Sequence, residues 1–105
     1  FVALAKQQLK AGYKNVAAVL VSAAMEDALK RKAEELGINV IDKNMSTVIN
    51  ALKSKSFFKG TQGAIVTSYT QLRNAAMHAD WDAIQEADVN GLIGFLESFL
   101  LENFS

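Results

Sequence analysis

The feature that most constrains the fold of this chain is a run of strong helix formers from Tyr13 to Leu36, which ends at Gly37. Glycine at such a position commonly takes the left-handed conformation that ends a helix, so the run predicts one long helix. The first half of the run is apolar on nearly all sides, and the second half is amphipathic. We therefore expect this helix at the centre of the domain, with its first half between other helices.

Shorter helical patterns lie before and after the long one. Residues 1–10 predict a short helix that stops near Gly12, and residues 38–45 predict a polar connection. After this connection, Ser46 is expected to cap a third helix. The apolar residues expected in that helix are Val48, Ile49 and Leu52.

Two further helices are expected in the second half of the chain. Thr61 is expected to cap the first of them, and residues 79–85 form a polar break before the second. The inward residues predicted for the first are Ile65, Tyr69, Leu72 and Ala76, and those for the last helix are Val89, Leu92, Ile93, Leu96, Leu100 and Phe104. Gly91 and Gly94 each weaken a helix by roughly 1 kcal/mol relative to alanine, so close helix packing is expected beside them.

The size and composition of the chain indicate one helical domain. Its 105 residues suffice for a single hydrophobic core, half of them are apolar, and proline is absent. We predict an all-α fold over residues 1–105, an up-and-down bundle of four to five helices. Because helical character is already present at Phe1, we expect the domain to be part of a longer chain with a further domain.

Charge and residue usage exclude several classes of function. The 11 Lys and Arg residues balance the 11 Asp and Glu residues, so no net charge attracts nucleic acid or an anionic membrane. Cysteine is absent, which excludes disulfides and thiolate chemistry and favours a cytoplasmic location. The apolar run over residues 16–25 is too short to cross a bilayer. With one histidine and scattered carboxylates, neither a metal site nor a cofactor is expected.

The segment that carries chemistry runs from Arg73 to His78, with the sequence Arg-Asn-Ala-Ala-Met-His. His78 is the single histidine of the chain, and Arg73 is one of only two arginines. The helical repeat places Asn74, Met77 and His78 on the outward face and Arg73 on the flank. An outward face with a methionine and few charges suits a second subunit better than bulk water.

This segment resembles the signature of the HEPN superfamily, whose helical bundles carry arginine, a polar residue, three further residues and histidine. The resemblance extends to the order of helices over most of the chain. It implies a metal-independent endoribonuclease of a toxin–antitoxin, defence or RNA-processing system. It also implies a homodimer that joins two motifs through the motif-bearing helix, RNA as substrate, and an antitoxin or other partner.

The residues of the motif suit this chemistry, because RNA supplies its own nucleophile in the 2′-hydroxyl group. Histidine exchanges protons near neutral pH, so His78 is expected to act as the base and then as the acid. Arg73 is expected to stabilise the charge of the phosphorane, with Asn74 orienting the imidazole or the phosphate. The expected product is a 2′,3′-cyclic phosphate. The alternative is that both cations merely stabilise the carboxyl end of a helix.

Other charged residues near the motif have a functional and a structural interpretation. Glu26 either supports Arg73 by pairing with it or is a solvated carboxylate. Lys53, Lys55 and Lys59 surround Phe57 and Phe58, and either contact an RNA backbone or simply solvate a helix end above two core rings. Trp81 is expected to anchor the loop after the motif on the bundle or on a dimer partner, and the alternative is that it stacks on a base. Lys30, Arg31 and Lys32 are expected to be balanced by Glu34 and Glu35.

Three hypotheses follow from the sequence. The first is a homodimeric ribonuclease that uses His78 and Arg73, with Asn74 in support. The second is a catalytically silent module of the same fold that binds a partner protein or a nucleotide. The third is a structural helical domain of a larger protein.

Overall fold

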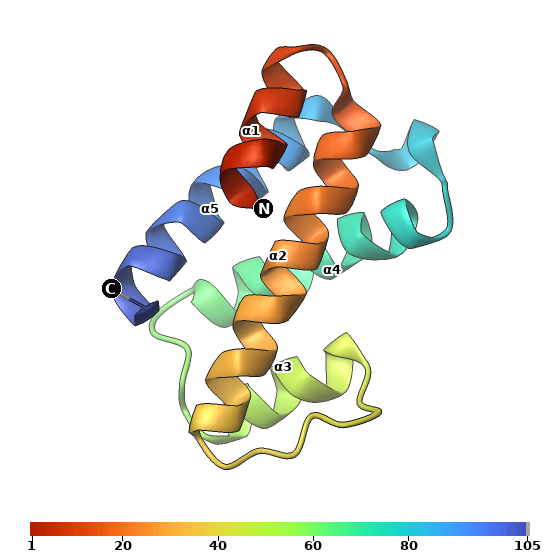
Figure 1. Ribbon diagram of the computed structural model, residues 1–105. Coiled ribbons are helices and arrows are strands. Elements are labelled where there is room, and N and C mark those ends of the chain that lie inside the picture. Colours follow the sequence, from red (N-terminus) through yellow and green to blue (C-terminus); the bar gives the residue numbers. More distant parts are fainter. Residues whose placement is uncertain (105) are drawn as a thin grey trace.

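Helix α2, Lys14–Glu35, is the centre of the fold, and it packs against all four other helices. The computed structural model describes residues 1–104. Among these residues it contains five α-helices, one short 3₁₀ helix and no β-strand, which confirms the predicted all-helical bundle. In Figure 1, α2 runs the length of the molecule. The other elements are α1 Val2–Lys10, α3 Met45–Ser54, α4 Gln62–Met77, η1 Trp81–Ala83 and α5 Glu86–Phe104.

The four other helices pack around α2. Helices α1 and α2 form an antiparallel hairpin, in which Gly12 takes a positive φ of 91° that suits glycine. Helix α3 packs on the second half of α2, and α4 crosses α2 (Figure 1). Helix α5 then packs against α1, α2 and α4 and so closes the bundle.

The buried side chains form one cluster to which all five helices and the loop after α4 contribute. Its largest fully buried members are Met25, Leu29, Leu52, Ile84, Leu92, Ile93, Leu96 and Phe99. Phe99 contacts the rings of Phe57 and Phe95 at centroid distances of 6.0 and 5.9 Å. Burial of these residues stabilises the bundle by roughly 1.5–3 kcal/mol for each large side chain. None of the helices within residues 1–104 has the length and apolar character needed to cross a membrane.

One predicted helix cap is wrong, and a second is confirmed in its position alone. Helix α3 begins at Met45, and its cap is Asn44, whose side-chain oxygen accepts a hydrogen bond from the backbone N–H of Thr47 at 2.8 Å. Asn44 lies one residue before the helix, where a short side chain reaches the unpaired amides, whereas Ser46 already lies inside it. Thr61 lies at the predicted N-cap position of α4, but its side chain makes no capping hydrogen bond.

The buried face of α4 is also turned relative to the prediction. Val66 is fully buried, whereas the predicted inward residue Ile65 is 36% exposed. The reason is that α4 packs against α2, α3 and α5, and Ile65 lies at the edge of the face that these three neighbours cover.

The two glycines of α5 have different surroundings. A Cβ atom at Gly91 would lie 2.9 Å from the hydroxyl oxygen of Tyr69, which confirms close packing there. A Cβ atom at Gly94 would meet nothing within 4 Å, so the same prediction is wrong for Gly94.

The ion pairs on the second half of α2 also differ from the prediction. Lys30 and Arg31 pair with residues one turn earlier, Glu26 and Asp27, and only Lys32 pairs with one of the predicted partners, Glu35. An acidic residue four positions before a basic one is the more favourable orientation on a helix, which accounts for this choice.

Candidate functional site

The Arg73–His78 segment forms the carboxyl end of α4, and His78 is the residue that caps it. The backbone N–H of Asp80 donates to the carbonyl of Ala75 at 2.8 Å, and that of Ala79 donates to the carbonyl of Ala76 at 3.3 Å. This pair of bonds is the Schellman arrangement that ends many helices. Ala79 takes the left-handed position with φ of 54°, which costs a non-glycine residue about 1 kcal/mol. The chain therefore turns sharply just after His78.

The side chain of His78 is exposed and makes no hydrogen bond or ion pair with any residue from 1 to 104. Only its backbone is engaged, because its N–H donates to the carbonyl of Asn74 at 3.0 Å. Asn74 and Met77 are exposed on the same helix end, as expected. The imidazole is thus accessible to a substrate or to a second protein chain.

Arg73, in contrast, is held against α2, and its side chain is only 18% exposed. One terminal nitrogen, Nη2, lies 3.4 Å from both carboxylate oxygens of Glu26, and the other, Nη1, donates to the side-chain oxygen of Asn74 at 3.2 Å. The pairing expected between Glu26 and Arg73 is therefore present. Asn74 turns toward Arg73, and no hydrogen bond joins its side chain to the imidazole of His78.

Glu26 carries the charge that balances this part of the structure. Its carboxylate oxygen Oε1 also forms an ion pair with Nζ of Lys30 at 3.0 Å. Burial alone would raise the pKa of Glu26, but the hydrogen bond from Lys30 and the charges of Arg73 and Lys30 outweigh it and lower the pKa below its ordinary value. Glu26 is therefore ionised at neutral pH and fixes the position of the guanidinium.

A small groove of about 230 Å³ lies beside this ion pair, between α2 and α4. Two of its lining residues have buried polar atoms without a hydrogen-bond partner within residues 1–104, the hydroxyl of Ser22 and Nε of Arg73. Its rim is apolar, since Val19 is 45% exposed and Met77 is 64% exposed, and Val16 nearby on α2 is 47% exposed. The prediction that the first half of α2 lies wholly between other helices is therefore wrong on this side.

The three lysines proposed to bind substrate lie at the other end of α4. The ammonium of Lys53 donates to the hydroxyl of Thr67 at 2.8 Å, and Thr67 precedes His78 by eleven residues, or about 16 Å along the helix. Lys55 and Lys59 are exposed in the connection between α3 and α4. The structure does not bring these lysines to the motif, and their contact with RNA stays a prediction.

The rings beside these lysines, Phe57 and Phe58, are half-buried against the core, 5.2 Å apart between centroids. This agrees with the structural interpretation of the two phenylalanines.

Trp81 anchors the loop after the motif to the bundle, as expected, because it is half-buried against the core. Lys14 strengthens this attachment, since its ammonium donates to the carbonyls of Trp81 and Ile84 at 3.2 and 2.7 Å. Asp80 and Asp82 are exposed on either side of the ring. A side chain of α2 therefore holds the loop between α4 and α5 in place.

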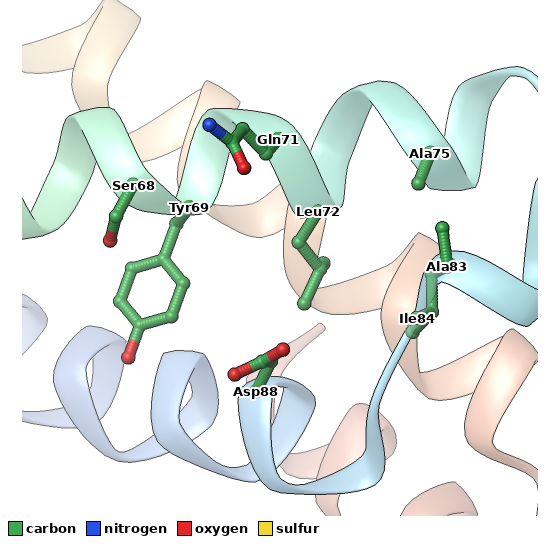
Figure 2. A pocket seen from close by; sticks show the side chains of 8 residues that line it. All are labelled: Ser68, Tyr69, Gln71, Leu72, Ala75, Ala83, Ile84 and Asp88. Atoms are coloured by element: carbon green, nitrogen blue, oxygen red, sulfur yellow. The ribbon is translucent and has the colours of Figure 1, made fainter.

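The sequence prediction missed a cavity of about 330 Å³ on the far side of α4, shown in Figure 2. It lies between α4, the loop that contains η1, and the first turns of α5. Tyr69 and Asp88 face it from α4 and α5, respectively (Figure 2). No sequence pattern marks it, because its residues come from three elements.

A charge asymmetry was also missed, although the sequence contains it. All 11 Lys and Arg residues lie within residues 1–73, whereas residues 74–105 contain none and carry six of the 11 acidic residues. The balanced net charge conceals this division. The six acidic residues are Asp80, Asp82, Glu86, Asp88, Glu97 and Glu102.

Comparisons with protein-family models, with curated proteins and with solved structures each gave no match for this chain. Any functional conclusion therefore depends on the residues of the site and on their geometry.

Proposed function

We propose that this chain is a metal-independent endoribonuclease of the HEPN type that acts as a homodimer, with His78 as the base and Arg73 as the stabiliser of phosphorane charge. The observation that carries the proposal is that one helix end holds both an exposed imidazole, which has no side-chain partner among residues 1–104, and a guanidinium positioned by Glu26 and Asn74. A catalytic group must be accessible, and its charged companion must be held in place.

The proposed reaction is transesterification within the RNA strand. His78 takes the proton of the 2′-hydroxyl, the 2′-oxygen attacks the adjacent phosphorus, and the bond from phosphorus to the 5′-oxygen breaks. The leaving oxygen takes a proton, which gives a 2′,3′-cyclic phosphate and a 5′-hydroxyl. The guanidinium has five N–H donors, and the contacts with Glu26 and Asn74 leave others for phosphate oxygens.

The geometry of α4 favours a site composed from two copies. Arg73 and His78 are five residues apart, which separates their directions by about 140° around the helix axis. One side chain lies against α2, and the other is exposed at the helix end. A second copy packed on the apolar strip of Val16, Val19 and Met77 would bring the imidazole of one chain to the guanidinium of the other.

The test is cleavage of a mixed pool of single-stranded and transfer RNA in the presence of EDTA, followed by analysis of the product ends. We expect cyclic-phosphate ends from the original protein and a loss of at least about a hundredfold in rate for His78→Ala and for Arg73→Ala. Ser98→Ala, an exposed position on α5, is the matched control and should retain full activity. Light scattering on each protein reports whether the dimer persists.

Cleavage retained by a folded His78→Ala variant would overturn the role of this residue. Absence of cleavage by a folded dimer would overturn the enzyme proposal itself.

A second candidate is a catalytically silent module of the same fold that binds a partner. Two observations favour it. The charge of Arg73 is already offset by Glu26, and the chain that follows His78 is acidic, which opposes the approach of phosphate groups. The same assay separates the candidates, because a silent module leaves the RNA uncut in all variants.

A further inference from the structure

The cavity between α4 and α5 combines an apolar wall with hydrogen-bonding groups (Figure 2). Leu72, Ala75 and Ile84 supply the apolar side. Asp88 and the hydroxyl of Tyr69 lie toward α5, and Ser68 and Gln71 supply polar groups on α4. Such a lining suits a ligand with a hydrocarbon stem and a polar end.

The polar groups of this cavity are available for a ligand. The side chains of Asp88 and Gln71 and the hydroxyl of Tyr69 make no hydrogen bond or ion pair with any residue that the structure describes. The hydroxyl of Ser68 donates to the carbonyl of Ile65 at 2.6 Å, which leaves its oxygen able to accept. The cavity thus presents unused acceptors from two helices.

Tyr69 is placed here by the packing of α5. The missing side chain of Gly91 provides the space for its hydroxyl, which would lie 2.9 Å from a Cβ atom at that position. Burial, and next the charge of Asp88, raise the pKa of Tyr69, so the hydroxyl stays protonated at neutral pH.

The charge of the surroundings selects among ligands. Of residues 1–104, Asp88 is the one charged residue that lines the cavity, and the sequence from residue 74 onward contains six acidic residues and no Lys or Arg. The ammonium of Lys14 reaches the carbonyl of Ile84, but it is engaged there and lines no part of this cavity. An anionic group such as a nucleotide phosphate is therefore disfavoured, and a cation is favoured.

An organic cation fits this cavity better than a metal ion does. A Ca²⁺ or Mg²⁺ site needs several oxygen ligands, usually with more than one carboxylate or with substrate phosphates, and only one carboxylate from the described residues lines the cavity. Neutral acceptors on α4 together with one carboxylate on α5 instead suit a planar group with many donors. A guanidinium has five N–H donors in a fork that matches a carboxylate, and its three methylene groups can lie on an apolar wall.

We propose that this cavity binds the arginine side chain of a basic segment of a partner protein, with the guanidinium on Asp88 and the stem against Leu72 and Ile84. A segment with further basic residues is favoured over a free amine, because residues 74–105, which supply one wall of the cavity, carry six acidic residues and no basic one and so attract additional positive charges. The proposal is independent of the ribonuclease proposal, since it uses the side of α4 that faces α5.

The test is titration of the ¹⁵N-labelled protein with the peptide acetyl-Gly-Arg-Gly-Arg-Gly-amide, followed by NMR. We expect shifts centred on the amides of Gln71, Ala75 and Asp88. Asp88→Asn should weaken binding by at least about tenfold, because one charge-assisted contact is lost. Asp42→Asn is the matched control, since Asp42 is exposed in the α2–α3 connection at a positive φ that asparagine also accepts. Its affinity should equal that of the original protein.

Two further ligands decide the chemistry. A peptide with citrulline in place of arginine has nearly the same shape without the charge and should not bind; equal binding would overturn the proposal. Agmatine, a small guanidine without a peptide backbone, should bind more weakly than the peptide. Equal affinity would overturn the proposal of a protein partner and would indicate a small guanidine as the ligand. Shifts at this cavity caused by an RNA oligonucleotide but not by the peptide would also overturn it.

Discussion

Replacement of Gly94 by alanine should stabilise this protein. Gly94 lies in the interior of α5, and a Cβ atom there meets nothing within 4 Å. Alanine is favoured over glycine inside a helix by about 0.8–1.0 kcal/mol, because an unfolded chain with alanine has less backbone freedom to lose on folding than one with glycine. With an unfolding entropy of about 2.1 cal/mol/K per residue, 105 residues give roughly 0.22 kcal/mol/K. The expected rise in Tm is therefore about 4 °C.

The assay is thermal unfolding by circular dichroism at one fixed protein concentration, because association would make Tm depend on concentration. Gly91→Ala is the matched control in the same helix. It has the same propensity gain, but its methyl group must displace the Tyr69 hydroxyl from 2.9 Å, so its stability should fall below that of Gly94→Ala. A Tm for Gly94→Ala that is unchanged or lower than that of the original protein would refute the reasoning. So would equal gains for the two variants.

Three other substitutions test the contacts that hold α4 and α3. Glu26→Gln should lower the free energy of unfolding by about 1 kcal/mol at pH 7, because Arg73 and Lys30 lose a charged acceptor. The pKa of Glu26 is lowered in the folded state. The stability difference between the two proteins should therefore be fully present above the unfolded pKa and should vanish as pH falls through the folded pKa. Denaturant titrations at several pH values measure this difference, and a difference that stays constant with pH would contradict the prediction. Asn44→Ala should lower the free energy of unfolding by about 1 kcal/mol, because the cap of α3 is lost. Ser46→Ala should lower it much less in the same denaturant titration. A larger loss for Ser46→Ala than for Asn44→Ala would show that Ser46 is the cap.

The two proposals place different partners on different sides of α4. Arg73 faces α2 beside an apolar strip, whereas Asp88 and Tyr69 line the cavity toward α5. His78, at the carboxyl end of the helix, is accessible from outside. A basic partner bound in the cavity that Asp88 lines would therefore lie close to the motif without occupying the groove on α2.

Most of the fold could be predicted because helix signals are local. Strong helix formers over the long run, ended by Gly37, predicted α2 and its central place. The outward direction of Asn74, Met77 and His78 followed from the helical repeat alone. Cap positions were less predictable, because Asn44 and Ser46 both have suitable side chains and only the backbone path selects one.

The sequence by itself determined the helical class, the position of the motif at a helix end, and the division between a basic first part and an acidic last part. These depend on residue type and on spacing along one helix. Only the tertiary structure decided which distant residues meet, such as Glu26 and Arg73, 47 positions apart, or Tyr69 and Asp88 across two helices. It also decided that Val16 and Val19 stay exposed, since an apolar residue is buried only where another element covers it.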